Sequence, residues 1–367
     1  MNVTRIHINN FRNIEETELF PDKGVNIIFG ENAQGKTNLL ESIWLFSGFR
    51  SFRGSKDNDL IKFGEEFLKS EIDFYGAGRE QNSKIIISRQ SKRILLNSVP
   101  LNAASKLIGN FNCVVFSPAY LSLIKGSPSE RRKFIDTAIC QIKPSFTKVI
   151  SDYNKILVQR NSLLKDLKIN KSSYDFLEIW NYKLAQTAVM IINERINYIK
   201  KLSEAASVIY LGLSGEKEKL DIEYKLRISS NKYETVTDSI DESRISELLK
   251  QSESSDILYG STNIGAHHDE IEIKIDNISA KNFGSQGQQR SAALALKLGE
   301  AEILKEITGE RPVALLDDVM SELDVNRQDY ILNHIKDWQV FITCCEPSTV
   351  LRLCEGKTFE ISNGRLK

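Results

Sequence analysis

The chain has 367 residues, 41% of them hydrophobic and 27% charged, which is enough to bury a large core and to form two domains. Its 49 Lys and Arg side chains balance 49 Asp and Glu side chains, which excludes a strong overall field and leaves nucleic-acid binding to a local patch. No apolar run approaches the ~20 residues of a membrane span, and residues 1–12 lack the pattern of a signal peptide. We therefore expect a cytoplasmic protein without a membrane partner.

The first predicted elements are two strands, residues 3–9 and 14–20, joined by Asn-Phe-Arg-Asn at 10–13. Residues 25–29, Val-Asn-Ile-Ile-Phe, are typical of a buried strand, and residues 36–46 carry apolar side chains at helical spacing. Strand, turn and helix in this order are the context that a phosphate-binding loop requires.

Between this strand and this helix, the chain matches G-x-x-x-x-G-K-[ST] at each of the four fixed positions. The backbone N–H groups of such a loop, at a helix N-terminus, favour phosphate oxygens. We expect it to bind a nucleoside triphosphate, with Lys36 reaching the β- and γ-phosphates and Thr37 serving as a ligand of Mg²⁺. The nucleotide-binding residues expected in the loop are Gly30, Glu31, Asn32, Ala33, Gln34, Gly35, Lys36 and Thr37.

Residues 50–53, Arg-Ser-Phe-Arg, indicate either a solvated basic turn or a contact to phosphate or nucleic acid. Three β-like runs follow at residues 67–75, 84–89 and 111–116, with turn residues between them. These elements predict the β-rich N-terminal part of a nucleotide-binding head, residues 1–125.

From residue 126 the pattern becomes helical. The segment 127–130, Ser-Pro-Ser-Glu, combines a serine cap, a proline at the first helical position and an acid in the first turn. Residues 174–213 repeat apolar side chains at helical spacing, as one long helix or two consecutive ones, and residues 220–228 alternate like a strand. A further helix is expected from Ser243. We predict a mostly helical inserted domain at residues 126–255.

The insert also holds the strongest basic patch of the chain. Between residues 143 and 171, seven basic side chains stand against Asp152 and Asp166, a local excess of five. The seven are Lys143, Lys148, Lys155, Arg160, Lys165, Lys168 and Lys171. Because contacts to phosphate supply most sequence-independent affinity for DNA, we expect this patch to contact DNA.

The remaining residues, 256–367, are expected to complete the head. Within them, a loop with His267 and His268 favours a solvated turn over a metal site, because adjacent histidines cannot easily share one ion. Ser285 and Gly287 precede the N-terminus of a long predicted helix and form a second candidate anion site. Since one chain needs only one phosphate cradle, these two residues would complete the site of a second copy.

An apolar run at 313–318, Val-Ala-Leu-Leu-Asp-Asp, predicts a central parallel strand directed at Mg²⁺. Adjacent residues of a strand point to opposite sides, so Asp317 and Asp318 should have different roles. We assign Asp317 to the Mg²⁺ shell and Asp318 to the attacking water. Strands at 340–344 and 357–361 finish the chain.

The five cysteines are scattered and show no C-x-x-C spacing, which favours reduced thiols over a zinc site or a disulfide framework. They are Cys113, Cys140, Cys344, Cys345 and Cys354. Since Cys344 and Cys345 lie in a strand-like run, packing in the core is favoured over redox chemistry.

The order of these motifs, ending in Ser-Glu-Leu-Asp at 321–324, resembles an ABC-type ATPase head split by an insert. The whole chain resembles the RecF family of bacterial DNA-repair ATPases, relatives of the SMC heads. The resemblance is carried by residues 10–13, 30–41, 50–53, 126–136, 159–165, 284–298 and 315–324. It implies an α/β fold: an ABC-type, SMC-like P-loop ATPase head with an inserted, mostly helical second domain.

The resemblance also implies a function. It implies ATP and Mg²⁺ as cofactors, a homodimer that forms on ATP, and binding to duplex and gapped DNA. It implies action with RecO and RecR in loading RecA during DNA repair, replication and the SOS response. Hydrolysis would be slow, with Lys36, Asp317 and Asp318 as the catalytic residues.

Three features depart from related families. RecF relatives have a sequence similar to Pro-His-Arg-Asp at the position where this chain has Ala-His-His-Asp, residues 266–269. Thr-Cys-Cys at 343–345 occupies the place of the switch histidine of ABC transporters, and no linking-loop glutamine stands at 116–120.

Three other function classes stay open on the sequence. The insert and the missing histidine speak against an ABC transporter subunit. An SMC-like tether would need hundreds of coiled-coil residues, more than residues 126–255 supply. A P-loop kinase would be distinguished by ATP consumption that responds to a metabolite rather than to DNA.

Overall fold

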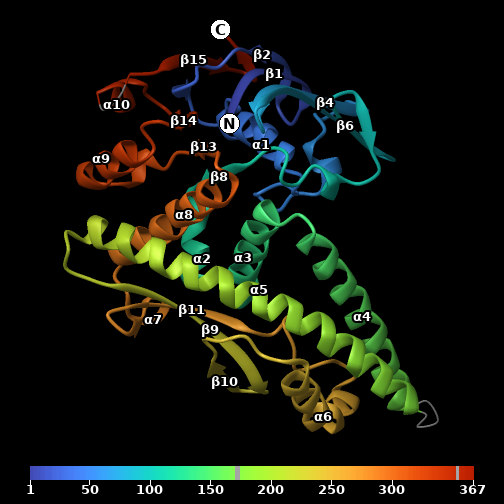
Figure 1. The fold of residues 1–367 in the computed structure, drawn as a ribbon. Helices are drawn as coiled ribbons and strands as arrows, with labels where there is room; N and C mark the ends of the chain where they lie inside the picture. Colours follow the sequence, from blue (N-terminus) through green and yellow to red (C-terminus); the bar gives the residue numbers. More distant parts are fainter. Residues whose placement is uncertain (170–173, 353–354) are drawn as a thin grey trace. The chain divides into compact units, whose positions relative to one another are not determined.

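The computed structural model describes the chain except for two short segments (Figure 1). The described residues are 1–169, 174–352 and 355–367. Lys171 of the predicted basic patch and Cys354 lie outside them. Within these ranges, no helix combines the length and the apolar character that crossing a membrane requires.

The chain forms two compact units. The first contains residues 1–120 and 297–367, and the second contains residues 121–296. The second crossing between them lies inside helix α8 (Gln286–Thr308). The domain boundaries at 125/126 and 255/256 were placed on composition rather than on contacts, and they stay a prediction.

The first unit contains an antiparallel sheet with the strand order β2-β1-β4-β5-β6-β7. Its strands are β1 (Asn2–Phe11), β2 (Ile14–Leu19), β4 (Phe67–Gly76), β5 (Arg79–Ser88), β6 (Lys92–Leu96) and β7 (Val99–Leu101). The first two strands pair as expected, with Ile6 opposite Leu19. The short strands β6 and β7 were not predicted, because Lys-Arg-Ile-Leu-Leu and Val-Pro-Leu lack strand alternation.

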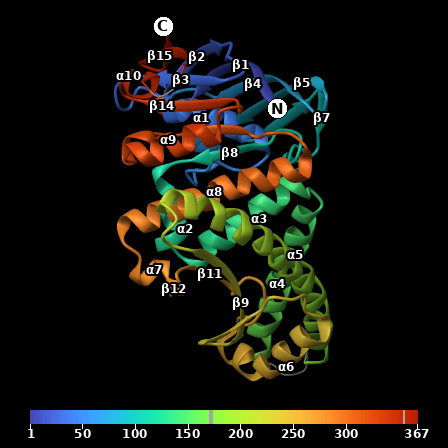
Figure 2. The ribbon, with the colours of Figure 1, turned by 60° about the vertical axis from the view of Figure 1, so that its left-hand side comes forward.

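The second sheet of this unit has the order β16-β15-β3-β14-β13-β8, and its strands from β15 to β8 are parallel (Figure 2). The strands are β3 (Val25–Phe29), β8 (Cys113–Phe116), β13 (Val313–Leu316), β14 (Val340–Cys344), β15 (Lys357–Ser362) and β16 (Arg365–Leu366). Helix α1 (Lys36–Trp44) contacts both β1 and β14, and one apolar core joins it to both sheets. Parallel strands place their carboxyl ends at one edge, so the residues after β3, β13 and β14 meet there.

Smaller elements complete the first unit. They are α9 (Val325–His334) and α10 (Ser348–Leu351). The second unit contains α2 (Leu121–Lys125), α3 (Pro128–Ile142), α4 (Phe146–Leu167), α5 (Asp175–Ser214), α6 (Glu242–Tyr259) and α7 (Ala280–Phe283). Its sheet consists of β10 (Lys232–Thr235), β9 (Leu220–Ser229), β11 (Glu270–Ile275) and β12 (Ile278–Ser279), in that order.

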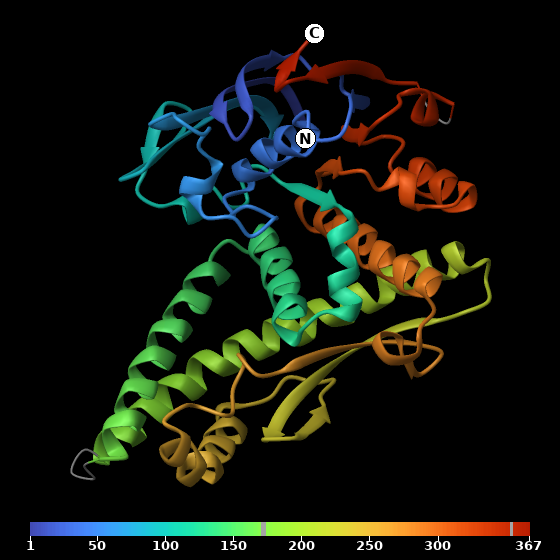
Figure 3. The same ribbon diagram turned by 180° about the vertical axis from the view of Figure 1, so that it is seen from behind.

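Helices α4 and α5, green and yellow-green in Figure 3, pack side by side in the second unit. Helix α5 is one continuous helix of 40 residues, which decides between the two alternatives that the sequence left open. Helix α3 begins as predicted, because Ser127 and Glu130 form a capping box in which the Ser127 N–H donates to Glu130 Oε2 at 2.7 Å. The helices expected after Ser127 and at residues 174–213 are thus found at Pro128–Ile142 and Asp175–Ser214.

Arg160 is not part of a DNA-facing surface, contrary to the sequence-based expectation. Its side chain is fully buried, and its guanidinium donates to Asp256 at 2.8 Å, to Asn181 at 2.8 Å and to Thr262 at 2.7 Å. The sequence around a basic residue in a helix does not show that an acid 96 positions away will neutralise its charge. Arg160 instead ties α4 to α5 and α6.

We expect Arg160→Ala to destabilise the protein by about 3–5 kcal/mol, because it leaves Asp256 as an unpaired buried charge. Lys155→Ala on the same helix is the matched control, since that side chain is 74% exposed and its loss should cost less than about 0.5 kcal/mol. Chemical denaturation of both variants measures the difference. Equal midpoints for the two variants would contradict the structural role of Arg160.

The pair His267 and His268 does not form the solvated turn that the sequence favoured. The His267 ring is hydrogen-bonded to the Tyr153 hydroxyl at 2.6 Å, and both rings lie within 3.2 Å of the Thr262 carbonyl oxygen. Burial lowers the pKa of His267 to about 3, so the ring is neutral at pH 7. Among the described residues, no group of three His, Cys, Asp or Glu side chains could hold a metal ion.

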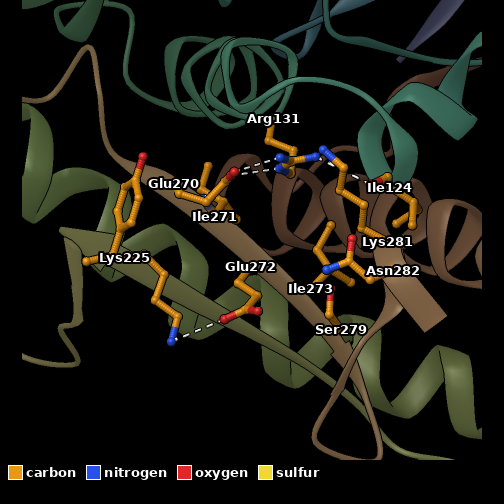
Figure 4. A pocket seen from close by; sticks show the side chains of 11 residues that line it. Ile124, Arg131, Lys225, Glu270, Ile271, Glu272, Ile273, Ser279, Lys281 and Asn282 are labelled. Carbon is orange, nitrogen blue, oxygen red and sulfur yellow. Dashed lines mark hydrogen bonds and ion pairs between the residues drawn. The ribbon is translucent and has the colours of Figure 1, made fainter. Parts of the chain in front are cut away.

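A cavity of about 340 Å³ lies beside β11 in the second unit (Figure 4). Arg131 donates to both carboxylate oxygens of Glu270, at 2.8 and 2.7 Å, and Lys225 lies 3.2 Å from Glu272. Because these cations are neutralised by acids in the same wall, the cavity is a poor site for phosphate. The candidate nucleotide site therefore rests on the first unit.

Candidate nucleotide site

The phosphate-binding loop has the geometry that its sequence predicts. It connects β3 directly to α1, and Lys36 is the first residue of the helix. The Lys36 ammonium is directed back across the loop, where it donates to the carbonyl oxygens of Gly30 at 2.6 Å and Glu31 at 3.1 Å. Lys36 is buried, whereas Glu31 and Asn32 are exposed. The charged group thus lies inside a loop whose rim is accessible.

Both fixed glycines are required by close contacts. A Cβ atom on Gly30 would lie 2.3 Å from the Ile361 carbonyl oxygen. Gly35 has a φ of 115°, and a Cβ atom there would lie 2.8 Å from Asn13 Oδ1. The loop is therefore braced by the C-terminal strand β15 and by the connection between β1 and β2, which sequence reasoning did not assign to the site.

Thr37 and Asp317 meet although 280 positions separate them in the chain. The Thr37 hydroxyl donates to Asp317 Oδ1 at 2.7 Å. Burial raises the pKa of the Asp317 carboxyl, and the Thr37 hydrogen bond opposes this rise. A hydroxyl and a carboxylate side by side are hard oxygen donors of the kind that Mg²⁺ prefers, so the residues present fit that ion.

Asp318 differs from the expected strand geometry. Strand β13 ends at Leu316, and Asp318 follows in a left-handed conformation with a φ of 51°. Its N–H donates to Thr343 Oγ1 at 2.9 Å, and its carbonyl oxygen accepts from the Ser321 hydroxyl at 2.8 Å. The expectation that two strand neighbours point to opposite sides was therefore wrong in its premise, because a turn and not strand pleating orients Asp318.

Glu41 joins three of the segments on which the family resemblance rests. This buried carboxylate accepts from Arg12 at 2.5 and 2.9 Å and from the Ser51 hydroxyl. Arg53 lies 3.7 Å from Glu41 and donates to Asn38 Oδ1 at 2.9 Å. Ser51 is thus buried against α1, whereas Arg50 and Arg53 stay exposed, so the choice between a solvated basic turn and a contact to phosphate or nucleic acid stays a prediction.

Cys345 is not a core residue, although its position in an apolar run favoured that interpretation. It lies one residue beyond β14 and is exposed. Its thiol donates to Asn32 Oδ1 at 3.3 Å, and Lys36 Nζ lies 3.6 Å from Sγ. The thiol therefore sits directly against the phosphate-binding loop.

We expect N-ethylmaleimide to modify Cys345 faster than Cys113 and Cys140, which are buried and whose pKa values are raised by burial. ATP in the loop should slow the modification of Cys345 roughly tenfold, because it covers Asn32 and Lys36. Peptide mapping by mass spectrometry measures the rate at each cysteine.

Lys36→Met supplies the control for this labelling experiment, since it should abolish protection by ATP without exposing the buried thiols. Modification of Cys345 at the same rate with and without saturating ATP would contradict a nucleotide in this loop.

Ser285 and Gly287 lie at the N-terminus of α8, in the second compact unit. The Ser285 N–H donates to Gln288 Oε1 at 2.7 Å, and Ser285 Oγ accepts from the Gln288 N–H at 3.2 Å. This reciprocal cap uses the oxygen of the exposed Ser285 as an acceptor and leaves its hydroxyl hydrogen available for an anion. Gly287 does not precede the helix as expected but is its second residue, and the second anion site stays a prediction.

Comparisons with known proteins agree with these features. Residues 2–107 match the RecF/RecN/SMC N terminal domain. The chain is 41% identical over 365 residues to the DNA replication and repair protein RecF of Caldanaerobacter subterraneus subsp. tengcongensis, covering 98% of each chain. It is also 41% identical over 346 residues to the RecF protein of Ruminiclostridium cellulolyticum, covering 94% of this chain and 92% of the relative.

A solved structure of the recombination mediator protein RecF with ATP, from the RecFOR pathway, is similar over 100% of this chain and 97% of its own, with 40% identity and a TM-score of 0.90. A Smc head domain derived from Pyrococcus furiosus is similar over 100% and 95% of the two chains, with 16% identity and a TM-score of 0.56, which shows the fold alone. The fold is that of an ABC-type, SMC-like ATPase head, as predicted, and the chain belongs to the RecF family.

Proposed function

We propose that this chain is an ATP-switched DNA-binding protein of recombinational DNA repair and replication. It forms homodimers on ATP, binds duplex and gapped DNA, and acts in the cytoplasm with RecR and RecO to load RecA at single-strand gaps. Its hydrolysis of ATP is slow and resets the dimer. The observation that carries the proposal is the 2.7 Å hydrogen bond between Thr37 and Asp317, which joins the phosphate loop to the acid after β13.

The residues of the first unit divide the work of binding and hydrolysis. The N–H groups of the loop and the Lys36 ammonium bind the phosphates, and Asp318 orients the attacking water. Mg²⁺, held by Thr37 and Asp317, would neutralise charge that develops on the phosphate oxygens. The nucleotide of each chain is already bound by that chain's own loop. The helix start at Ser285 and Gly287 therefore contacts the γ-phosphate of the nucleotide that a second copy binds.

Dimerisation on ATP follows from this arrangement. ADP lacks the γ-phosphate that the second copy would contact, so only ATP favours the dimer. A titration of duplex, gapped and single-stranded DNA, with and without ATP, tests the proposal. Affinity that ATP does not change on any of these DNAs would contradict an ATP-switched DNA-binding protein.

The exposed face of α4 is the proposed DNA surface, now without Arg160. Lys148, Lys155 and Lys165 remain exposed on this helix. Because each neutralised phosphate contributes about −0.9 to the slope of log affinity against log salt, replacing all three lysines by Ala should flatten the slope by roughly 2.7. Binding measured by fluorescence anisotropy at several salt concentrations gives the slope.

A triple variant with the same change in charge is the matched control for this experiment. It replaces the exposed residues Lys23, Lys217 and Lys232 by Ala and should keep the wild-type slope. If the salt dependence of DNA binding decreases by the same amount in both triple variants, the net charge of the protein and not α4 determines binding. An unchanged slope in the α4 variant would exclude α4 as the DNA surface.

A further inference from the structure

One buried hydroxyl contacts both acids of the nucleotide site. Thr343 is fully buried within β14, and its Oγ1 accepts the N–H of Asp318 at 2.9 Å. The same hydroxyl donates to Asp317 Oδ1 at 3.1 Å, which is shorter than its 3.5 Å distance to the Leu316 carbonyl oxygen. Asp317 Oδ1 therefore accepts hydrogen bonds from two hydroxyl groups, those of Thr37 and Thr343.

The sheet explains why this hydroxyl reaches both acids. Strand β14 lies between β13 and β3, with Ile342 opposite Leu316 and Thr343 opposite Ile28. Thr343 is thus one residue beyond the last pair with β13, at the point where Asp317 leaves the sheet. A β-branched side chain has few χ1 rotamers in a strand, so the hydroxyl is held in place before nucleotide binds.

We propose that Thr343 is a positioning residue for hydrolysis, an inference that rests on the proposed ATPase function. Its hydroxyl orients the Asp317 carboxylate towards Thr37 and stabilises the left-handed turn that directs Asp318. It acts through these two acids and does not contact nucleotide.

The variants Thr343→Val and Thr343→Ser distinguish the effect of the hydroxyl group from the effect of the side-chain shape. Valine keeps the branched shape but removes the hydrogen bond to the Asp317 carboxylate and the acceptor of the Asp318 N–H, so kcat should fall ~10- to 100-fold. The Kd of ATP should stay within about threefold, because the loop is untouched, and half-saturation with Mg²⁺ should need a higher concentration. Serine retains the hydroxyl and should restore kcat to within about threefold of wild type.

A second measurement uses the nucleotide-free protein. Thr343→Val and Asp317→Asn should have non-additive effects on the free energy of unfolding if the two side chains interact. Additive effects, or a wild-type kcat in Thr343→Val, would overturn the inference. Should Thr343→Val not fold, Thr343→Ala is measured in the same two assays and is held to the same outcomes.

Failure of the inference and failure of the proposed function are distinguishable. A wild-type protein that neither binds nor hydrolyses ATP contradicts the proposed function, whereas the double-mutant cycle still decides whether Thr343 holds Asp317. A wild-type protein that hydrolyses ATP, together with an equally active Thr343→Val variant, contradicts only the role of Thr343.

Discussion

Replacing Ser285 by arginine is expected to abolish dimerisation on ATP and to remove hydrolysis, while the binding of ATP to the loop stays unchanged. Ser285 is exposed at the start of α8, where its own N–H and the Gln288 N–H are hydrogen-bonded within the cap. The longer arginine side chain would block the approach of an anion to the helix start and would place a cation at the positive end of the helix dipole. Sedimentation with ATP and a phosphate-release assay measure the two losses.

Mixing variants gives the sharpest test of a site that two chains share. Lys36→Met should fail at productive nucleotide binding and is inactive alone. In a mixed pair, the loop of the Ser285→Arg chain meets the intact helix start of the Lys36→Met chain, so one of two sites is complete. Because neither variant forms homodimers on ATP, each pair that forms is mixed and has one complete site of two, so the mixture should reach up to about half of the wild-type rate.

The control for the added charge is Asn282→Arg, because Asn282 is exposed and lies three residues before Ser285. That variant should dimerise and hydrolyse ATP as the wild type does. No recovery on mixing, together with full activity of Ser285→Arg alone, would refute the shared site and leave a self-contained ATPase.

Asp318→Asn should keep ATP binding but slow hydrolysis by roughly 100-fold or more, the range that general-base groups contribute. Asparagine tolerates the left-handed conformation seen at this position, with its φ of 51°, so the turn should survive the change. The loss of the carboxylate charge then removes the group that we propose to orient the attacking water. Long-lived dimers with ATP are the second expected result.

Single-turnover hydrolysis and the lifetime of the dimer after dilution measure both effects. Asp329→Asn is the matched control, since this acid is exposed on α9 and should leave both quantities unchanged. Turnover at the wild-type rate in Asp318→Asn would exclude Asp318 from the mechanism and direct attention to other acids near the loop.

The sequence by itself determined the elements whose signals are local. The strand before the loop was predicted at 25–29 and is found at Val25–Phe29, because a short apolar run next to a glycine turn has few alternatives. The start of α3 followed from its serine cap and proline. The phosphate loop was identified because its glycines, lysine and threonine stand at fixed spacing, although the contacts of Gly30 and Thr37 come from the distant residues Ile361 and Asp317.

Tertiary structure alone decided which side chains meet or become accessible. Arg160 and Lys155 look alike in the sequence, yet one is buried against Asp256 and the other is exposed. Cys345 reads as a core residue but is exposed beside the loop, and Thr343 reads as an ordinary strand residue but holds both acids. The reason is physical: burial and hydrogen bonding depend on partners from distant segments, whereas periodicity reports only the neighbours along the chain.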